Sequence, residues 1–364
     1  MTTIFDGMPL ISADSHVTEP IDLYAERLPA SMRHRAPTIH NQGDWRILEA
    51  EGMAIRKLMS ASELDLAVVG GSSSEQRFRE QEQDGVVAEV VFPNWALQVC
   101  FVPEDPELQK GLARAYNDWA AETMLGEERI LPVGLVSMLD IDAAVKEAER
   151  LAGLGFRALF LPARVPSRPY NDAAYDPFWA TAQEIGLPLT FHSGTGYDPR
   201  IVRGPGAAVI NYVLGAQSDG PSVFLHLAAG GALDRFPGLR IVAVETCAAW
   251  MAWVMTQADL VYEDHKMFRT TSLTMKPSEL IRRQCHATFM TDTVAVHNRS
   301  ITGVEPLLWG NDYPHPEGTW PHSVEAVHDQ FAELTREDVF AMVAGNAARV
   351  FGFDISSLPV LASA

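Results

Sequence analysis

Ile11-Ser12-Ala13-Asp14-Ser15-His16 is a short apolar run that ends on a carboxylate and an imidazole. Similar runs begin near positions 187 and 307, and they end on His192 and Asp312. Asp14 and His16 are two positions apart, so on an extended strand their side chains point to one face. Imidazoles and carboxylates at the ends of separate strands are the ligands that a divalent metal site needs. We therefore expect these four residues to bind one metal ion.

Apolar runs alternate with helical patterns over most of the chain, which is typical of parallel βαβ units. The expected strands are Pro9–His16, Ala88–Asn94, Ile130–Met138, Phe156–Ala163, Leu187–His192, Leu239–Glu245, His286–Thr291 and Pro306–Asn311. Helices are expected after Asp105-Pro106, over Asp142–Leu154, after Asp176-Pro177, and from Ser323 and Thr335. About eight such units predict an α/β fold of the closed (β/α)8 TIM-barrel type, in which the carboxyl ends of the strands converge at one mouth.

Residues 17–87 interrupt this alternation, because no second barrel strand is recognisable for about 70 positions after the first. Within them we expect a helix over Arg46–Leu58, a flexible loop at Gly70–Ser74 and a charged helix over Glu75–Gln83. We interpret the region as an insertion beside the barrel mouth. The expected organisation is one domain over residues 1–364, with C-terminal helices at about 323–352.

The composition and net charge of the chain limit which kinds of molecule it is expected to bind. The formal net charge is 28 − 47 = −19, a surface that repels nucleic acid and anionic membranes. No apolar stretch reaches transmembrane length, and the N-terminus lacks the pattern of a signal peptide. Three widely spaced cysteines argue against a disulfide framework. We expect a cytoplasmic protein that acts on a small molecule and binds neither nucleic acid nor membrane.

Five motifs, spread from the first strand to the last helix, carry a family resemblance. They are Asp14–Pro20, Phe191–Gly194, Asp234–Arg240, Gly310–Gly318 and Gly345–Arg349. With them the chain resembles the amidohydrolase-related family that includes the aminocarboxymuconate semialdehyde decarboxylase-like enzymes. The resemblance implies a distorted (β/α)8 barrel, often a homodimer, with one divalent ion, zinc or manganese, on His16, His192 and Asp312. It also implies non-oxidative decarboxylation or hydrolysis, often of aromatic or unsaturated acids.

Two residues depart from the family pattern. Asp14 stands where many members carry a second histidine, which favours an oxygen-preferring ion such as Mn²⁺. Glu245 stands where the better-studied decarboxylases carry a catalytic histidine at a strand end. A glutamate donates or accepts a proton there if burial raises its pKa toward neutrality. The alternative is that the Glu245 carboxylate only orients a neighbouring group.

Five further side chains are candidates for the site, each with a structural alternative. Glu19 is either an extra metal ligand or a cap of the turn before the following proline. His315 and Glu317 either face the pocket, His315 then joining catalysis, or belong to a rigid proline-rich turn. Trp250 and Trp320 either stack on a flat substrate or pack in the interior.

These observations leave three functional hypotheses. The first is a metal-dependent decarboxylase of a small cyclic or aromatic carboxylic acid in secondary metabolism, with Glu245 and Asp312 in catalysis. In that reaction Glu245 or water in the site protonates the carbon that carries the carboxylate. The second is a metal-dependent hydrolase of a cyclic amide, a lactone or a carbon–carbon bond, with Glu245 as the base. The third is a barrel that binds without catalysis.

Overall fold

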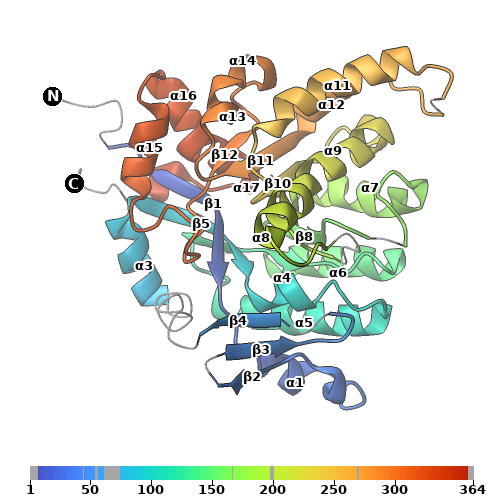
Figure 1. The fold of residues 1–364 in the computed structure, drawn as a ribbon, viewed down its shortest axis with the longest axis vertical. Helices are drawn as coiled ribbons and strands as arrows, with labels where there is room; N and C mark the ends of the chain where they lie inside the picture. The colour runs from blue at the N-terminus through green and yellow to red at the C-terminus, as the bar shows by residue number, and fades with distance from the viewer. Residues whose placement is uncertain are drawn as a thin grey trace.

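The computed structural model describes residues 7–43, 45–53, 56–60, 74–165, 167–196, 201–268 and 270–359. All but the last residue of the loop predicted at Gly70–Ser74 lies outside these ranges. Figure 1 shows strands in the middle of the molecule and helices around them, with α11 extending away from the body.

Parallel strands form the centre of the fold, and they fall into two sheets. Their bounds are β1 Leu10–Val17, β5 Val86–Pro93, β6 Ile130–Pro132, β7 Gly134–Leu135, β8 Leu159–Pro162, β9 Leu189–His192, β10 Ile241–Val244, β11 Cys285–Phe289 and β12 Leu307–Trp309. One sheet has the order β1-β5-β6 and the other the order β12-β11-β10-β9-β8-β7. All eight residues of β1 and of β5 are buried, as expected for parallel strands covered on both faces.

The two sheets meet at both of their edges, so the strands follow one another around a distorted (β/α)8 barrel. At one edge β6 continues directly into β7. The predicted third strand is interrupted there because Pro132 has no N–H to donate to a ladder. At the other edge, between β12 and β1, the described chain has a single bridge that pairs Ser15 with Tyr313. We call this edge the β12–β1 seam.

The helices follow the strands, as the sequence predicts. Those outside the insertion are α4 Trp95–Val99, α5 Pro106–Thr123, α6 Ile141–Leu154, η2 Ala173–Tyr175, α7 Asp176–Ile185, α8 Ala207–Ile210, η3 Asn211–Gly215, η4 Ala216–Ser218, α9 Asp219–Ala229, α10 Ala232–Arg235, α11 Trp250–Asp264, α12 Pro277–Gln284, α13 Thr293–His297, α14 Arg299–Thr302, α15 Ser323–Phe331, α16 Arg336–Phe340, η5 Ala341–Gly345, α17 Asn346–Phe351 and η6 Ile355–Ser357. Among the described residues, none of these helices is both long and apolar enough to cross a bilayer.

Helix boundaries follow local capping chemistry. Asp105 accepts a hydrogen bond from the Glu107 amide at 2.9 Å and begins α5, while Thr335 accepts one from the Asp338 amide at 3.1 Å and begins α16. Gly155 ends α6 with a φ of 103°, a left-handed conformation that glycine adopts without a Cβ penalty.

The insertion contains a three-stranded antiparallel sheet, at the lower edge of the molecule in Figure 1. Its elements are α1 Leu23–Arg27, η1 Arg33–Arg35, β2 Thr38–Gln42, β3 Trp45–Glu49, β4 Arg56–Ser60 and α3 Ser74–Gln83. The helix predicted over Arg46–Leu58 is therefore wrong. Gly52, with a φ of 78°, turns the chain in the middle of that range, and β2 supplies a hydrogen-bonding partner for β3. The charged helix predicted over Glu75–Gln83 is confirmed as α3.

One buried histidine near the start of β11 makes stability depend on pH. His286 is 8% exposed and its Nδ1 lies 3.2 Å from the Glu305 carbonyl oxygen. Burial lowers the pKa of His286 from 6.5 to about 4. Between these values the unfolded chain binds a proton that the folded chain does not. The free energy of unfolding therefore falls as pH falls from 6.5 to 4, by roughly 3 kcal/mol at most from this residue.

We expect His286→Gln to lose less stability than the wild type over that range, because glutamine does not titrate. Urea unfolding at pH 6.5 and pH 4.5 measures the difference, and the exposed His297→Gln serves as the control. Equal losses in the wild type and in His286→Gln would contradict the assignment.

Candidate metal centre

The predicted ligands come together at the carboxyl ends of the barrel strands. Asp14 and His16 lie near the end of β1, and His192 is the last residue of β9. Glu245 directly follows β10, and Asp312 lies three residues after β12. All five have side chains that are 9% exposed or less. The alternation of strand and helix has thus gathered residues that are almost 300 positions apart.

The ligand atoms form a compact cluster around His16 Nε2. This atom lies 3.2 Å from Asp312 Oδ1, 3.3 Å from His192 Nε2, 3.6 Å from Asp14 Oδ1 and 3.9 Å from Glu245 Oε2. His192 Nε2 lies 3.3 Å from Glu245 Oε2 and 3.7 Å from Asp14 Oδ1. In a tetrahedral site, metal–ligand bonds of about 2.0–2.2 Å place neighbouring ligand atoms about 3.3–3.6 Å apart. The shorter separations match this spacing, and the longer ones exceed it by a few tenths of an ångström.

Several polar atoms of the cluster are left unsatisfied by the described chain. Asp14 Oδ1 and both carboxylate oxygens of Asp312 are buried and accept no well-aligned hydrogen bond from described residues, although Asp312 Oδ1 lies 2.9 Å from His315 Nδ1. Burying a carboxylate oxygen without a donor costs free energy. A cation between the side chains would supply the missing interaction. Two overlapping groups have metal-binding spacing, and both contain His16: one with Glu245, Asp312 and His315, the other with Asp14 and His192.

The protonation states of the cluster are strongly shifted by neighbours. Burial, with the charge of His315, lowers the pKa of His16 to about 3. Burial opposes the charged form of His192, yet the Asp14 carboxylate and other acids raise its pKa to about 9. Burial likewise opposes ionisation of Asp312, but His315 and His16 hold the pKa of this carboxyl well below its usual range. Opposite shifts in adjacent groups are typical of functional sites.

His315 belongs to the cluster, whereas Glu317 does not. The His315 ring stacks on the His16 ring with centroids 4.0 Å apart. Its Nδ1 lies 2.9 Å from Asp312 Oδ1, and its Nε2 lies 2.8 Å from Asn94 Oδ1. His315 therefore faces the site from the turn after Asp312. Glu317 is exposed further along the same turn, and its charge contributes to the raised pKa of His315.

Glu245 is held in an unusual backbone conformation. Its φ is 54°, a left-handed value that side chains other than glycine adopt at a cost. Its amide donates to Thr288 Oγ1 at 2.8 Å, and its Oε1 accepts a hydrogen bond from the Tyr212 hydroxyl at 3.0 Å. Burial, followed by the charge of Asp312, raises the pKa of Glu245 to about 8. Asp312 has a similar φ of 55°, so two of the clustered residues share this strain.

Three other predicted candidates lie outside the cluster. Glu19 is buried, and its oxygens accept hydrogen bonds from the Tyr24 hydroxyl at 2.7 Å and from backbone amides that follow β5. Trp250 donates its indole N–H to backbone carbonyls and packs edge-on against Phe224. Trp320 packs edge-on against the buried Tyr313 ring. Glu19 thus binds the amides at the start of α4 rather than the turn before the following proline, and the two half-buried tryptophans make packing contacts.

Sequence reasoning missed three residues that contact the cluster. Asn94 and Thr288 lie just beyond or within barrel strands, so their position near a strand end was a usable signal. Tyr212 lies in η3, a single π-helical turn, and its surroundings contain no recognisable motif. Turns of this kind are frequent at functional sites but have no simple sequence signature.

Gly310 determines how closely β12 approaches the ligand pair on β1. A Cβ at this position would lie 2.8 Å from Asp14 Cβ and 2.9 Å from the Asp14 amide nitrogen. We expect Gly310→Ala to displace Asp14, lower the free energy of unfolding by about 1–3 kcal/mol and weaken metal binding. Chemical denaturation and titration with Mn²⁺ measure the two effects. Gly153→Ala, where an added Cβ meets nothing, is the control. Unchanged metal affinity in Gly310→Ala would refute the role given to this contact.

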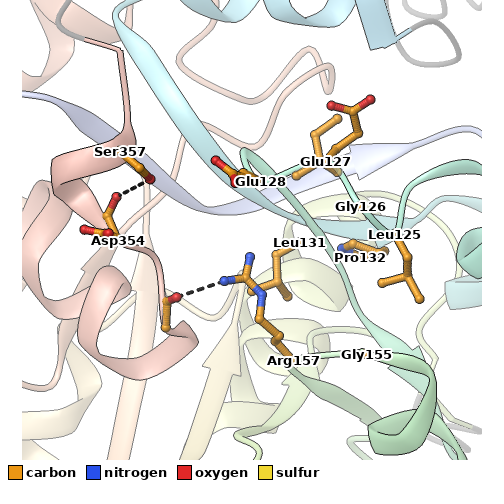
Figure 2. Close-up of a pocket in the computed structure, with 12 residues that line it drawn as sticks. Leu125, Gly126, Glu127, Glu128, Leu131, Pro132, Gly155, Arg157, Asp354 and Ser357 are labelled. Carbon is orange, nitrogen blue, oxygen red and sulfur yellow. Dashed lines mark hydrogen bonds between the residues drawn. The ribbon is translucent and has the colours of Figure 1, made fainter.

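A separate cavity of about 370 Å³ lies near the amino ends of β6 and β8, away from the cluster. Figure 2 shows its lining, which includes Arg157, Glu127, Glu128 and Asp354. Arg157 donates to the Gly352 carbonyl at 2.9 Å. The cavity contains none of the clustered residues. In barrels this face generally serves stability rather than catalysis.

Solved structures resemble the fold over nearly its whole length. An amidohydrolase from Mycobacterium avium subsp. paratuberculosis K-10, map2389c, superposes with a TM-score of 0.75 at 17% identity, covering 95% of this chain and 99% of that one. The 5-carboxyvanillate decarboxylase LigW from Sphingomonas paucimobilis superposes with a TM-score of 0.72 at 21% identity, covering 95% and 100%. A 5-carboxyvanillate decarboxylase from Novosphingobium aromaticivorans with bound manganese gives 0.72 at 15% identity, covering 97% and 99%.

Sequence comparison leads to the family. Decarboxylase orsB from Emericella nidulans is 28% identical over 253 residues, which cover 61% of this chain and 70% of that protein. The family model described as amidohydrolase matches residues 75–353 and so includes every barrel strand except β1. This chain belongs to the amidohydrolase family.

Proposed function

We propose that this chain is a divalent-metal-dependent, non-oxidative decarboxylase of a small aromatic carboxylic acid. The observation that carries the proposal is the buried cluster at the barrel mouth, with unsatisfied carboxylate oxygens and a glutamate at its edge. Family membership supports an enzyme with a metal centre. The relatives named as decarboxylases, two of them for 5-carboxyvanillate, support loss of CO₂ from an aromatic acid.

We assign the metal to Asp14, His16, His192 and Asp312. Bound there, a divalent ion would act as a Lewis acid on oxygens of the substrate and offset the charge of the two aspartates. The two carboxylates make manganese the preferred ion over zinc, because oxygen ligands suit harder cations. The manganese reported with the Novosphingobium enzyme supports this choice.

Glu245 is the proposed acid. Burial raises the pKa of the Glu245 carboxyl, and a divalent ion bound beside it would lower that pKa again, which leaves the carboxyl able to exchange a proton. Tyr212 holds Oε1 by a hydrogen bond, so Oε2, which faces the two histidines, remains to carry the proton. The proton passes from Glu245 to the ring carbon that bears the carboxylate. The bond from that carbon to the carboxylate then breaks, its electron pair returns to the ring, and CO₂ leaves.

Hydrolysis is the second candidate, and Glu245 is the observation that favours it. A carboxylate in this position can accept a proton from water as readily as it can donate one to carbon. In that reaction Glu245 deprotonates the water that attacks the carbonyl carbon of a cyclic amide, a lactone or a ketone. The bond from that carbon to nitrogen, oxygen or carbon then breaks, and the leaving atom takes the proton from Glu245. The same cluster would then serve addition of water rather than loss of CO₂.

Isotopes separate the two reactions. Manganese-loaded protein is incubated with a panel of hydroxybenzoic acids labelled with ¹³C in the carboxyl group, and in parallel with lactone and cyclic-amide substrates. We expect ¹³CO₂ from an aromatic acid and, in D₂O, one deuterium on the ring carbon. In H₂¹⁸O the organic product should contain no new oxygen. An organic product that gains ¹⁸O without release of CO₂ would overturn the decarboxylase in favour of the hydrolase.

The proposal extends to the setting of the enzyme. We infer a homodimer that acts in the cytoplasm on a small molecule of secondary metabolism. Exposed apolar side chains on α11, among them Trp253, Leu260 and Val261, support contact with a second copy. The three cysteines, all unpaired, support a reducing compartment. Light scattering after size exclusion tests the dimer, which a monomer mass would refute.

A further inference from the structure

The β12–β1 seam holds three of the four proposed ligands. Asp14 and His16 lie on one side of it and Asp312 on the other. The His16 amide donates to the Tyr313 carbonyl at 2.6 Å, and the Asp312 amide donates to the Asp14 carbonyl at 2.9 Å. The ladders of β1 with β5 and of β9 with β8 and β10 each pair four residues or more. The spacing between the ligands across the seam therefore depends on unusually few backbone bonds.

Helix α3 of the insertion covers the back of this seam with one polar face. In Figure 1 it lies beside β5 and below α15. Residues at helical spacings of three and four make up the face and its continuation into the following turn: Arg77, Glu80, Gln81 and Asp84. Three of these four residues are at most 3% exposed. Polar side chains are rarely buried this deeply unless they bind specific partners.

Arg77 contacts the His16 side of the seam directly. Its Nη1 donates to the His16 carbonyl at 2.7 Å. Its Nε and Nη2 form a bidentate pair with the buried Glu89 of β5, with Nη2 at 2.9 Å from Oε2. Its guanidinium also lies over the Tyr313 ring, 5.0 Å from the centroid. One side chain thus links β5, the backbone of a proposed ligand and the residue after Asp312.

The rest of the face contacts the Asp312 side. The Asn311 side chain donates to Gln81 Oε1 at 2.8 Å and lies 3.3 Å from Asp84 Oδ2. The Tyr313 hydroxyl donates to Glu80. Helix α3 therefore binds the residues immediately before and after Asp312.

We propose that α3 is a clamp on the β12–β1 seam and that Arg77 is its positioning residue, which sets the spacing of His16 and Asp312 for the metal. The inference rests on the metal site of the proposed function and assigns a role to a part of the insertion. Packing alone would not require a buried Arg77–Glu89 ion pair, because such a pair is often no more stable than apolar residues of similar volume. A fixed donor fork does, however, hold a carbonyl and a carboxylate in one geometry.

Binding of Mn²⁺ alone, without substrate, tests the proposal. The full chain carries either Arg77→Met together with Glu89→Gln, so that no charge is left unpaired, or the conservative Arg77→Lys. We expect the double variant to weaken Mn²⁺ binding by about tenfold or more in calorimetric titration, as for other residues that orient metal ligands. Arg77→Lys should bind with intermediate affinity. The electron paramagnetic resonance spectrum of the bound Mn²⁺ should change in the double variant.

Two variants of the same helix are matched controls. Arg79→Met removes an exposed arginine that pairs only with Glu75 among the described ion pairs, and it should leave affinity unchanged. Phe78→Leu removes packing against Arg129 without touching the seam. It should lower the melting temperature but not the Mn²⁺ affinity of the folded protein. A structural role of Arg77 alone would make the double variant behave like Phe78→Leu, and that result would overturn the clamp.

Hydrogen exchange of the wild-type protein gives a second measurement, which decides the matter if the double variant does not fold. Mn²⁺ should slow exchange of the α3 amides more than that of α6, which lies on another side of the barrel. Equal effects on α3 and α6 would overturn the proposal. A wild-type protein that binds no divalent ion would instead refute the metal site itself, so the two failures are distinguishable.

Discussion

Replacing His192 with alanine is expected to remove the bound metal and to lower turnover by a factor of about 10³ or more, because the Lewis acid is lost with its ligand. His192, a proposed ligand, lies at the end of β9, outside the β12–β1 seam, and its Nε2 lies 3.3 Å from His16 Nε2. Without it the remaining ligands approach an ion only from the β12–β1 seam. Elemental analysis of the purified protein and the rate of CO₂ release measure the two effects.

The exposed His297→Ala is the matched control, since it removes an imidazole outside the cluster. It should retain full metal content and rate. A His192→Ala protein with unchanged metal content would argue strongly against the ligand assignment. Loss of metal with full activity would show that the reaction does not use the ion.

Glu245→Gln is expected to keep the metal and the fold but to lower turnover by about 10²–10⁴-fold, the usual contribution of a general acid or base. Glutamine has nearly the same shape, and its amide oxygen still accepts the Tyr212 hydrogen bond that Glu245 Oε1 accepts. It cannot deliver a proton. Rates of CO₂ release and of deuterium uptake at the ring carbon, together with metal content, measure the outcome.

Glu333→Gln, an exposed glutamate after α15, is the control and should behave as the wild type. Loss of metal from Glu245→Gln would make Glu245 a ligand instead of the proton donor, which the spacing of Glu245 with His16, Asp312 and His315 would explain. Full activity in Glu245→Gln would exclude both roles.

The strand ends were the predictable part of this protein. Parallel barrels impose one rule, that all strands finish at the same mouth, so Asp14, His16, His192 and Asp312 had to approach one another once eight strands were recognised. Capping is equally local, and Thr335 begins α16 as its sequence indicates. The positions of the strand ends and of the helix start both follow from short-range sequence patterns, and tertiary packing leaves them unchanged.

The insertion was less predictable because its structure depends on partners elsewhere. Residues 45–49 become a strand by pairing with β2, and nothing in their own composition requires that. Outside the insertion, Tyr212 contacts Glu245 from a single π-helical turn, a feature with no simple sequence signature. Likewise, the sequence of α3 alone predicts that its polar face is exposed to solvent, whereas in the structure this face contacts the β12–β1 seam. The identity of a charged residue does not predict which residue it contacts in the folded protein.

The left-handed backbone at the barrel mouth also limits how this enzyme can be stabilised. In the described chain the non-glycine residues with positive φ are Glu245, Cys247 and Asp312. Glycine would relieve about 1 kcal/mol at each position. A search for thermostable variants would thus select glycine at these three positions. At two of them, Glu245 and Asp312, the substitution would remove a side chain that the proposed reaction needs. Only Cys247 offers relief without that loss, so thermal selection and selection for turnover should diverge at this end of the molecule.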